Sequence, residues 1–128
     1  MLRHAFFSDF KSGPKLHFWG DAADMCVLAK FLEEISRQPT DSAISVPGLS
    51  VDNFRVIVRS LRRAAGMSKS NPNAFEWSLD RETAMDFSEK VSVLGDCKSV
   101  GHQYLECGTP GEICVMVSCG EYPDNLQP

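Results

Sequence analysis

The stretch from Ala74 to Gly95, AFEWSLDRETAMDFSEKVSVLG, contains the two patterns that decide the fold class. Its first six residues alternate between apolar and polar side chains, which is typical of a strand with one buried face. Asp80 is a favoured helix N-cap residue, and the apolar residues after it recur at helical spacing. The buried stripe of that helix would be Ala84, Phe87, Val91 and Leu94. The stretch therefore predicts a strand over 74–79 followed directly by a helix.

A second strand and helix are predicted nearer the N-terminus. Residues 15–19, Lys-Leu-His-Phe-Trp, alternate in the same way and stop at Gly20. Asp21 is the N-cap of a helix over 22–37, in which the apolar residues again follow helical spacing. Pro39 prevents that helix from continuing.

The remaining segments read as strands and turns. Ala43–Val46 is a short strand. Residues 51–65 fit either a strand or a helix, and the β-branched alternation within them favours the strand. Residues 66–73 are polar and read as a loop. His102–Cys107 and Ile113–Ser118 form a C-terminal β-hairpin with a loop of four to five residues.

Taken together, these segments predict an α+β fold in one domain over residues 1–128. We expect a mostly antiparallel sheet, with the two helices packed on one face and the hairpin closing it. The sequence indicates no linker and no internal repeat.

Composition narrows the classes of function. The chain is 43% hydrophobic and 23% charged, so it contains enough apolar residues for a core. A net charge of -4 disfavours nucleic acid as a partner. No apolar run is long enough for a membrane span, and the first ten residues lack a signal-peptide core. With an odd number of cysteines, five, these features predict a cytoplasmic protein without a full disulfide framework.

The cysteines do not predict a metal or catalytic site. Cys97, His102, Cys107 and Cys119 are potential zinc ligands, but the chain has no Cys-x-x-Cys pair and the strand parity is wrong. A nucleophilic thiol needs a cationic neighbour, whereas Cys107 follows Glu106. We therefore expect no metal, no cofactor and no assigned catalytic residue.

Arginines gather in the segment 51–65 and raise the question of an anion site. If the segment is a strand, Arg55 and Arg59 lie on a solvated face beside Glu76 of a neighbouring strand. Cross-strand ion pairing then explains them better than phosphate binding does, because the chain has no glycine-rich phosphate loop.

The C-terminal hairpin carries the candidate binding residues. His102, Tyr104 and Glu106 have the same strand parity and share one face. Glu121 and Tyr122 follow the hairpin and complete the candidate set. His102 with Glu106 or Glu121 could act as an acid–base pair, but a histidine bonded to a backbone carbonyl beside a solvated glutamate is the favoured interpretation.

Three segments resemble a group of small, largely uncharacterised bacterial α+β proteins. The similarity rests on His102-Gln103-Tyr104-Leu105-Glu106, on Ser118-Cys119-Gly120-Glu121-Tyr122-Pro123 and on the Trp-containing strand Phe75–Leu79 with the helix after it. It covers about the C-terminal half of the chain. Small acidic α+β proteins of this kind include immunity proteins that neutralise bacterial toxins, so the resemblance implies such a role by analogy.

These observations predict a non-enzymatic protein–protein interaction domain, such as a toxin-immunity protein, rather than an enzyme. The expected partner is a basic toxin domain, or a second copy bound through a sheet edge. Nucleic acid and membrane are not expected partners. The alternative is a small enzyme or ligand-binding domain that uses His102 with Glu106 or Glu121.

Overall fold

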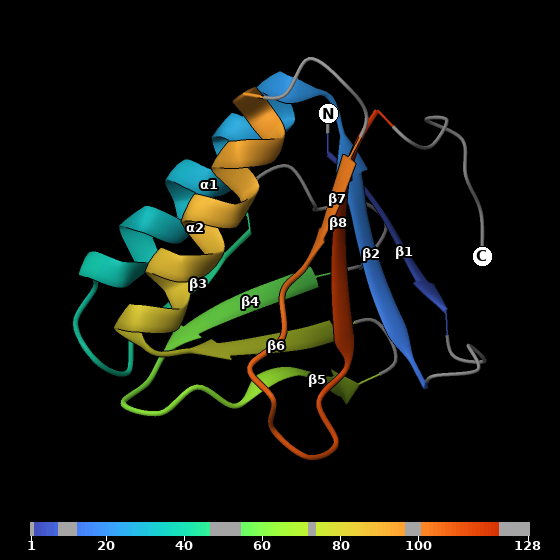
Figure 1. The fold of residues 1–128 in the computed structure, drawn as a ribbon. Helices are drawn as coiled ribbons and strands as arrows, with labels where there is room; N and C mark the ends of the chain where they lie inside the picture. Colours follow the sequence, from blue (N-terminus) through green and yellow to red (C-terminus); the bar gives the residue numbers. More distant parts are fainter. Residues whose placement is uncertain (1, 8–12, 47–54, 72–73, 97–100, 121–128) are drawn as a thin grey trace.

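The computed structural model describes residues 2–7, 13–46, 55–71, 74–96 and 101–120. These residues form two helices and eight strands (Figure 1). In chain order the elements are β1 (Arg3–Phe7), β2 (Lys15–Gly20), α1 (Ala22–Arg37), β3 (Ala43–Ser45), β4 (Arg55–Ser60), β5 (Gly66–Asn71), β6 (Ala74–Leu79), α2 (Arg81–Asp96), β7 (Gly101–Tyr104) and β8 (Cys114–Cys119).

The strands form two four-stranded sheets, called sheet A and sheet B below. Sheet A has the order β1-β2-β8-β7, and sheet B has the order β3-β4-β6-β5. In each sheet the two central strands are parallel, and each edge strand is antiparallel to its neighbour. Figure 1 shows the strands of sheet B running across those of sheet A. The sheets meet where Ile113 donates its N–H to the carbonyl of Met67, at 2.8 Å.

The predicted α+β class is confirmed, and the arrangement of its strands differs from the prediction in one respect. Four of the six strand pairings are antiparallel, as expected, but the strands lie in two sheets rather than one. The parallel pairs β2–β8 and β4–β6 join segments that are far apart in the sequence. Alternation along one strand shows which side chains share a face, but not which other strand lies beside it.

Both helices begin at the predicted aspartates. The side chains of Asp21 and Asp24 each accept the other's backbone N–H, which forms a capping box at the start of α1. Asp80 caps α2 by accepting the N–H of Thr83 at 2.7 Å. These caps satisfy N–H groups that have no partner inside the first helical turn, so the local sequence fixes where each helix starts.

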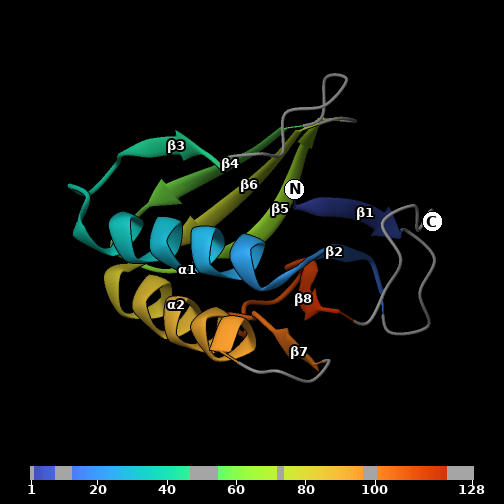
Figure 2. The same ribbon diagram turned by 90° about the horizontal axis from the view of Figure 1, so that it is seen from above.

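The helices pack against each other in antiparallel directions and cover the inner sides of the sheets (Figures 1 and 2). Ser88 donates its hydroxyl to the carbonyl of Ala29 at 2.7 Å in the middle of this contact. A Cβ at Gly95 would lie 3.2 Å from the sulfur of Cys26, so a larger residue there would push this side chain back by a few tenths of an ångström. Small residues on both helices therefore allow the close approach.

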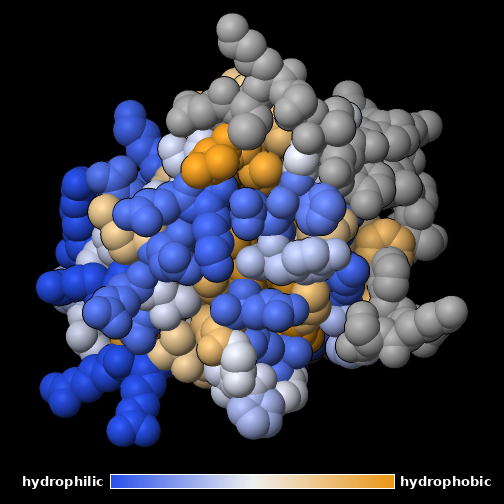
Figure 3. All heavy atoms as spheres, viewed as in Figure 1, coloured by the Kyte–Doolittle hydropathy of each residue, from blue (hydrophilic) through white to orange (hydrophobic). Residues whose placement is uncertain are grey.

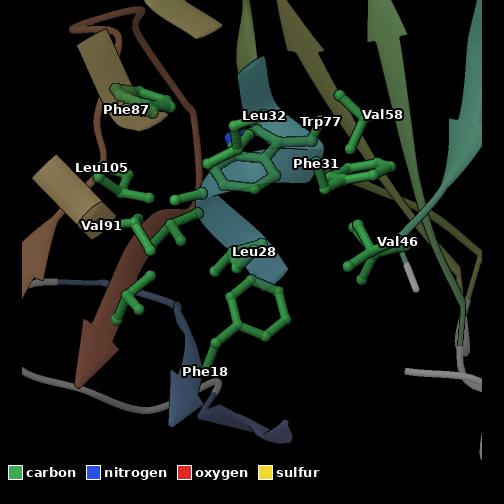
Figure 4. Packing of buried hydrophobic residues seen from close by; sticks show 14 of the residues in the cluster. Phe18, Leu28, Phe31, Leu32, Val46, Val58, Trp77, Phe87, Val91 and Leu105 are labelled. Carbon is green, nitrogen blue, oxygen red and sulfur yellow. The ribbon is translucent and has the colours of Figure 1, made fainter. Parts of the chain in front are cut away.

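The core lies between the helix pair and the inner faces of both sheets (Figure 4). Trp77 of β6 is fully buried, with its ring centroid 5.7 Å from that of Phe87 and 6.3 Å from that of Phe18. Phe18 comes from sheet A and Phe87 from α2, so Trp77 joins three layers. The predicted stripe of α2 is buried as expected, at Ala84, Phe87, Val91 and Leu94.

The two halves of the chain repeat the same ββαββ unit with an offset of 59 residues. Lys15 pairs with Cys114 in sheet A, and Arg55 pairs with Ala74 in sheet B, so the differences 74 minus 15 and 114 minus 55 are both 59. Ser88 bonds to Ala29, its own counterpart at this offset, which places that hydrogen bond on the axis of an approximate two-fold symmetry.

Equivalent hydrogen bonds confirm that the repeat is structural. Val46 N–H donates to Val56 O at 3.0 Å, and 59 residues later Leu105 N–H donates to Val115 O at 2.8 Å. Each unit gives one hairpin to each sheet: the first unit supplies β1–β2 to sheet A and β3–β4 to sheet B, and the second supplies the rest. The two halves therefore complete each other's sheets.

The prediction of no internal repeat is wrong at the level of structure. Across the aligned segments 15–37, 43–46 and 55–61 and their counterparts, the identical pairs are Asp21 and Asp80, Val56 and Val115, and Val58 and Val117. What the halves share is burial at equivalent positions, such as Leu16 and Phe75 or Leu32 and Val91. Different apolar side chains satisfy the same packing, so residue identity does not show the repeat.

The remaining local predictions were right for most segments. The ambiguous segment 51–65 contains strand β4, as favoured, and its residues 51–54 lie outside the described part of the chain. The polar stretch predicted as a loop contains β5, Gly66–Asn71, which pairs with β6 through backbone groups. β1 was not predicted. The C-terminal hairpin is confirmed, with a longer connection over 105–113 than expected.

Candidate functional site

The candidate residues of β7 lie on the outer face of sheet A, the face opposite the core. Strand parity and register give this face a set of side chains from β2, β8 and β7: Lys15, His17, Trp19, Cys114, Met116, Ser118, His102 and Tyr104, with Glu106 just beyond β7. The alternate residues of the same strands, such as Phe18 and Val117, are buried in the core. In Figure 2, β1, β2, β8 and β7 follow one another from the upper to the lower part of the picture.

His102, Tyr104 and Glu106 share this face, as their parity predicted. The rings of His102 and Tyr104 meet edge to face, with centroids 5.6 Å apart. The ammonium of Lys15 lies 5.4 Å from the centroid of the Tyr104 ring, a cation–π distance. Tyr104 is 45% exposed. This edge of sheet A therefore presents an aromatic ring, an imidazole and a carboxylate side by side.

Towards the middle of the same face, a histidine and a serine form a buried pair. His17 Nε2 lies 2.9 Å from Ser118 Oγ, across the parallel strands β2 and β8. His17 is 2% exposed and Ser118 is fully buried, and the imidazole ring lies 5.0 Å from the ring of Trp19. A serine bonded to a histidine resembles a nucleophile with its base, but burial of both groups keeps substrate away from the hydroxyl.

The outer face of sheet B holds an ion pair at the equivalent place. Arg59 and Glu76 correspond to Ser118 and His17 at the 59-residue offset, and Arg59 Nη2 lies 3.1 Å from Glu76 Oε1. The Arg59 Nε donates to the same oxygen at 3.2 Å. The prediction that cross-strand pairing with Glu76 accounts for arginine on this face is confirmed for Arg59.

The thiols of Cys107 and Cys114 have raised pKa values, although not for the reason expected. Burial raises the pKa of Cys107 to about 11, and the carboxylates of Glu112 and Asp80 add to the effect. The sequence had pointed to Glu106 as its neighbour. Glu106 instead raises the pKa of Cys114, which reaches about 12, mainly through burial and then through a hydrogen bond to this carboxylate. Both thiols are protonated at neutral pH and are poor nucleophiles.

The connection between β7 and β8 is organised by Glu112. Its carboxylate accepts the backbone N–H groups of Cys107, Gly108 and Thr109. This explains why the connection is longer than the predicted loop of four to five residues, because Glu112 holds a structured loop together.

The structure brings together some of the predicted site residues. His102 and Glu106 are both exposed on the outer face, which is not a deep catalytic pocket. Glu121 and Tyr122 lie outside the described residues. The sequence reasoning missed Lys15, because its place beside Tyr104 depends on the pairing of β2 with β8 across about a hundred residues. Alternation in residues 15–19 had placed His17 and Trp19 on one face, but nothing local linked that face to the C-terminal hairpin.

Two further features bear on the kind of site. A shallow cavity of about 420 Å³, lined by Ser36, Arg37, Arg81 and Met85, lies where α1 ends and α2 begins, away from β7. Within the described ranges, no three His, Cys, Asp or Glu side chains gather closely enough to hold a metal ion. Among those same residues, no helix has the length and apolar character needed to cross a membrane.

No family model, curated protein or solved structure matches this chain. The resemblance to immunity proteins therefore stays a prediction.

Proposed function

We propose that this chain is a protein-binding domain and that the β7 edge of sheet A, with His102, Tyr104 and Glu106, is its contact surface. Neutralisation of a bacterial toxin, as an immunity protein, is the specific form of this proposal. The chain would act by covering a surface of its partner rather than by changing it chemically.

The observation that carries the proposal is the difference between equivalent positions of the repeat. His102 and Tyr104 of β7 correspond to Ala43 and Ser45 of β3, so the same backbone carries an imidazole and a phenol ring in one sheet and two small residues in the other. Folding does not require the aromatic pair, because β3 forms without one. Exposed tyrosine is a residue type that often contributes much of the affinity at protein interfaces.

Charge supports a basic partner. The chain has a net charge of -4, and Glu106 places an exposed carboxylate beside Tyr104. The helix α2, whose C-terminal part packs against β7, exposes Glu89 as well, whereas its Asp86 is paired with Lys90 at 3.2 Å. A partner with a basic surface would be attracted to this side of the molecule, and occlusion of that surface would block its activity.

The proposal can be tested with the full chain as bait. Proteins that bind it in extracts of the source cells are identified, and one of them is purified for titration calorimetry. Tyr104→Ala should weaken that complex by about tenfold or more, as expected for an aromatic anchor. Glu76→Ala is the matched control on the outer face of sheet B and should leave the affinity unchanged.

Two results would count against the proposal. One is a chain that binds no protein specifically. The other is a complex that Tyr104→Ala and Glu76→Ala weaken equally, because the contact would then not lie on the β7 edge.

A further inference from the structure

We propose that β7 binds its partner by strand addition, in which an extended segment of the partner pairs with the backbone of Tyr104 and Glu106. This inference rests on the proposed function and adds the mode of recognition. Its occupant is an extended peptide segment that carries a basic side chain.

The direction of the backbone groups is the first step. Residues of an antiparallel strand alternate between those that exchange hydrogen bonds with the neighbour and those that do not. Leu105 donates its N–H to Val115 of β8, and Cys107, two residues on, donates its N–H towards Glu112. The N–H groups of Tyr104 and Glu106, in the opposite phase, therefore point away from β8.

That direction leads to the edge of the sheet. β7 is the last strand in the order β1-β2-β8-β7, and in the described part of the chain no strand pairs with it on the far side. Edge strands with available backbone groups accept an added strand, and pockets for alternate side chains then give specificity. The same two residues present their side chains on the exposed outer face, so backbone and side-chain recognition coincide here.

The side chains favour a basic residue in the added strand. Lys15 already lies over the ring of Tyr104, which shows that this ring accepts a cation on its face. Glu106 is exposed next to it. An arginine or lysine in the partner strand would pair with the Glu106 carboxylate and compete with Lys15 for the ring of Tyr104.

The repeat offers a contrast at the position of the donor. The residue 59 places before Glu106 is Pro47, which has no N–H group to donate. The second half of the repeat therefore has a backbone N–H group at this position, that of Glu106, and the first half has none.

The test uses the full chain and a library of random peptides displayed on phage. We expect selection to enrich peptides with basic residues at alternate positions. When a synthetic copy of an enriched peptide is added to the ¹⁵N-labelled chain, the amide protons of Tyr104 and Glu106 should exchange with solvent at least about tenfold more slowly. The amide proton of Leu105 is the internal control, because it already bonds to β8.

Two substitutions of Glu106 distinguish the contribution of its backbone N–H group from that of its charged side chain. Glu106→Pro removes the outward N–H and should weaken peptide binding by about tenfold or more, since a carbonyl of the added strand loses its donor. Glu106→Gln keeps the N–H and should weaken binding by about threefold or less, as for an exposed ion pair. Melting curves establish whether each variant is folded, and if Glu106→Pro is not, amide exchange in the wild-type chain decides.

Strand addition is overturned if no peptide is enriched, or if neither amide gains protection when a peptide binds. It is also overturned if folded Glu106→Pro binds as well as wild type. The proposed function survives these results when Tyr104→Ala still weakens the complex with the partner protein. It fails separately when Tyr104→Ala has no effect on that complex.

Discussion

The outer faces of sheets A and B occupy equivalent places in the repeat, yet they carry different chemistry. In sheet B, Arg59 of β4 and Glu76 of β6 lie diagonally across the two strands. They form an ion pair whose side chains are 44% and 33% exposed. In sheet A the equivalent pair is Ser118 and His17, which are buried and share a hydrogen bond of 2.9 Å.

This difference shows which positions the fold constrains and which positions can carry other residues. Both sheets keep apolar residues on the inner face, where the halves pack together, as with Val56 and Val115. The outer positions carry different residues, because packing in the shared core does not constrain them. A difference between equivalent positions of the repeat therefore points to residues that the fold does not require, and the comparison needs only one chain.

The largest loss of stability should come from placing the residue type of Glu76, in sheet B, at the equivalent position in sheet A, which is His17. His17→Glu puts a carboxylate at a position that is 2% exposed, opposite a serine instead of an arginine. We expect the free energy of unfolding to fall by about 3 kcal/mol or more, because a carboxylate loses its hydration in a buried position. Urea denaturation at pH 7 measures it.

The reverse exchange is the control. Glu76→His in sheet B breaks a part-exposed ion pair and should cost about 1 kcal/mol or less. Equal losses from the two variants would show that the faces tolerate charge equally, and the contrast between them would be lost.

Removal of one partner from each pair should again destabilise the chain more in sheet A than in sheet B, but by a smaller difference. Ser118→Ala leaves His17 Nε2 without the hydroxyl in a buried place and should destabilise the chain by about 1 to 3 kcal/mol. Arg59→Ala should cost about 1 kcal/mol or less, because water can solvate Glu76. A cost for Arg59→Ala as large as that for Ser118→Ala would contradict the assignment of the buried pair to sheet A.

At neutral pH the smallest effect concerns the thiols of Cys107 and Cys114, because there both are protonated in the folded and the unfolded state alike. Their folded pKa values, about 11 and about 12, lie above the ordinary value of 9.0, so the folded state holds these protons more tightly than the unfolded state does. This stabilisation is complete below about pH 9 and is lost as the pH rises through the folded pKa values. We therefore expect stability to decline between about pH 9 and pH 12.

Alkylation provides the direct measurement of these thiols. Iodoacetamide should modify Cys107 and Cys114 in the folded chain only slowly at pH 7.5, and the rates should still rise beyond pH 9. Exposed Cys26 serves as the internal comparison by mass spectrometry. A rate for Cys114 that levels off near pH 9 would mean that burial and Glu106 do not raise the pKa of this thiol in the folded chain.

Local structure was the most predictable part of the molecule. The helix over 22–37 and the strand over 74–79 have the bounds read from the sequence, because caps and hydrophobic periodicity are properties of neighbouring residues. β5 was missed because its sequence, Gly-Met-Ser-Lys-Ser-Asn, has no strand pattern of its own. Its pairing with β6 stabilises it instead.

Neighbouring residues are enough to predict the α+β class, the helix caps, the buried stripes and the shared face of His102, Tyr104 and Glu106, since each depends on a few turns or strand positions. Long-range packing sets the division of the strands into two sheets, the repeat of the two halves and the place of Lys15 beside Tyr104. The physical reason is that the parallel pairs β2–β8 and β4–β6 are chosen by packing in the common core. A local pattern determines which face of a helix or strand a side chain occupies, whereas the tertiary structure determines which residues lie beside it.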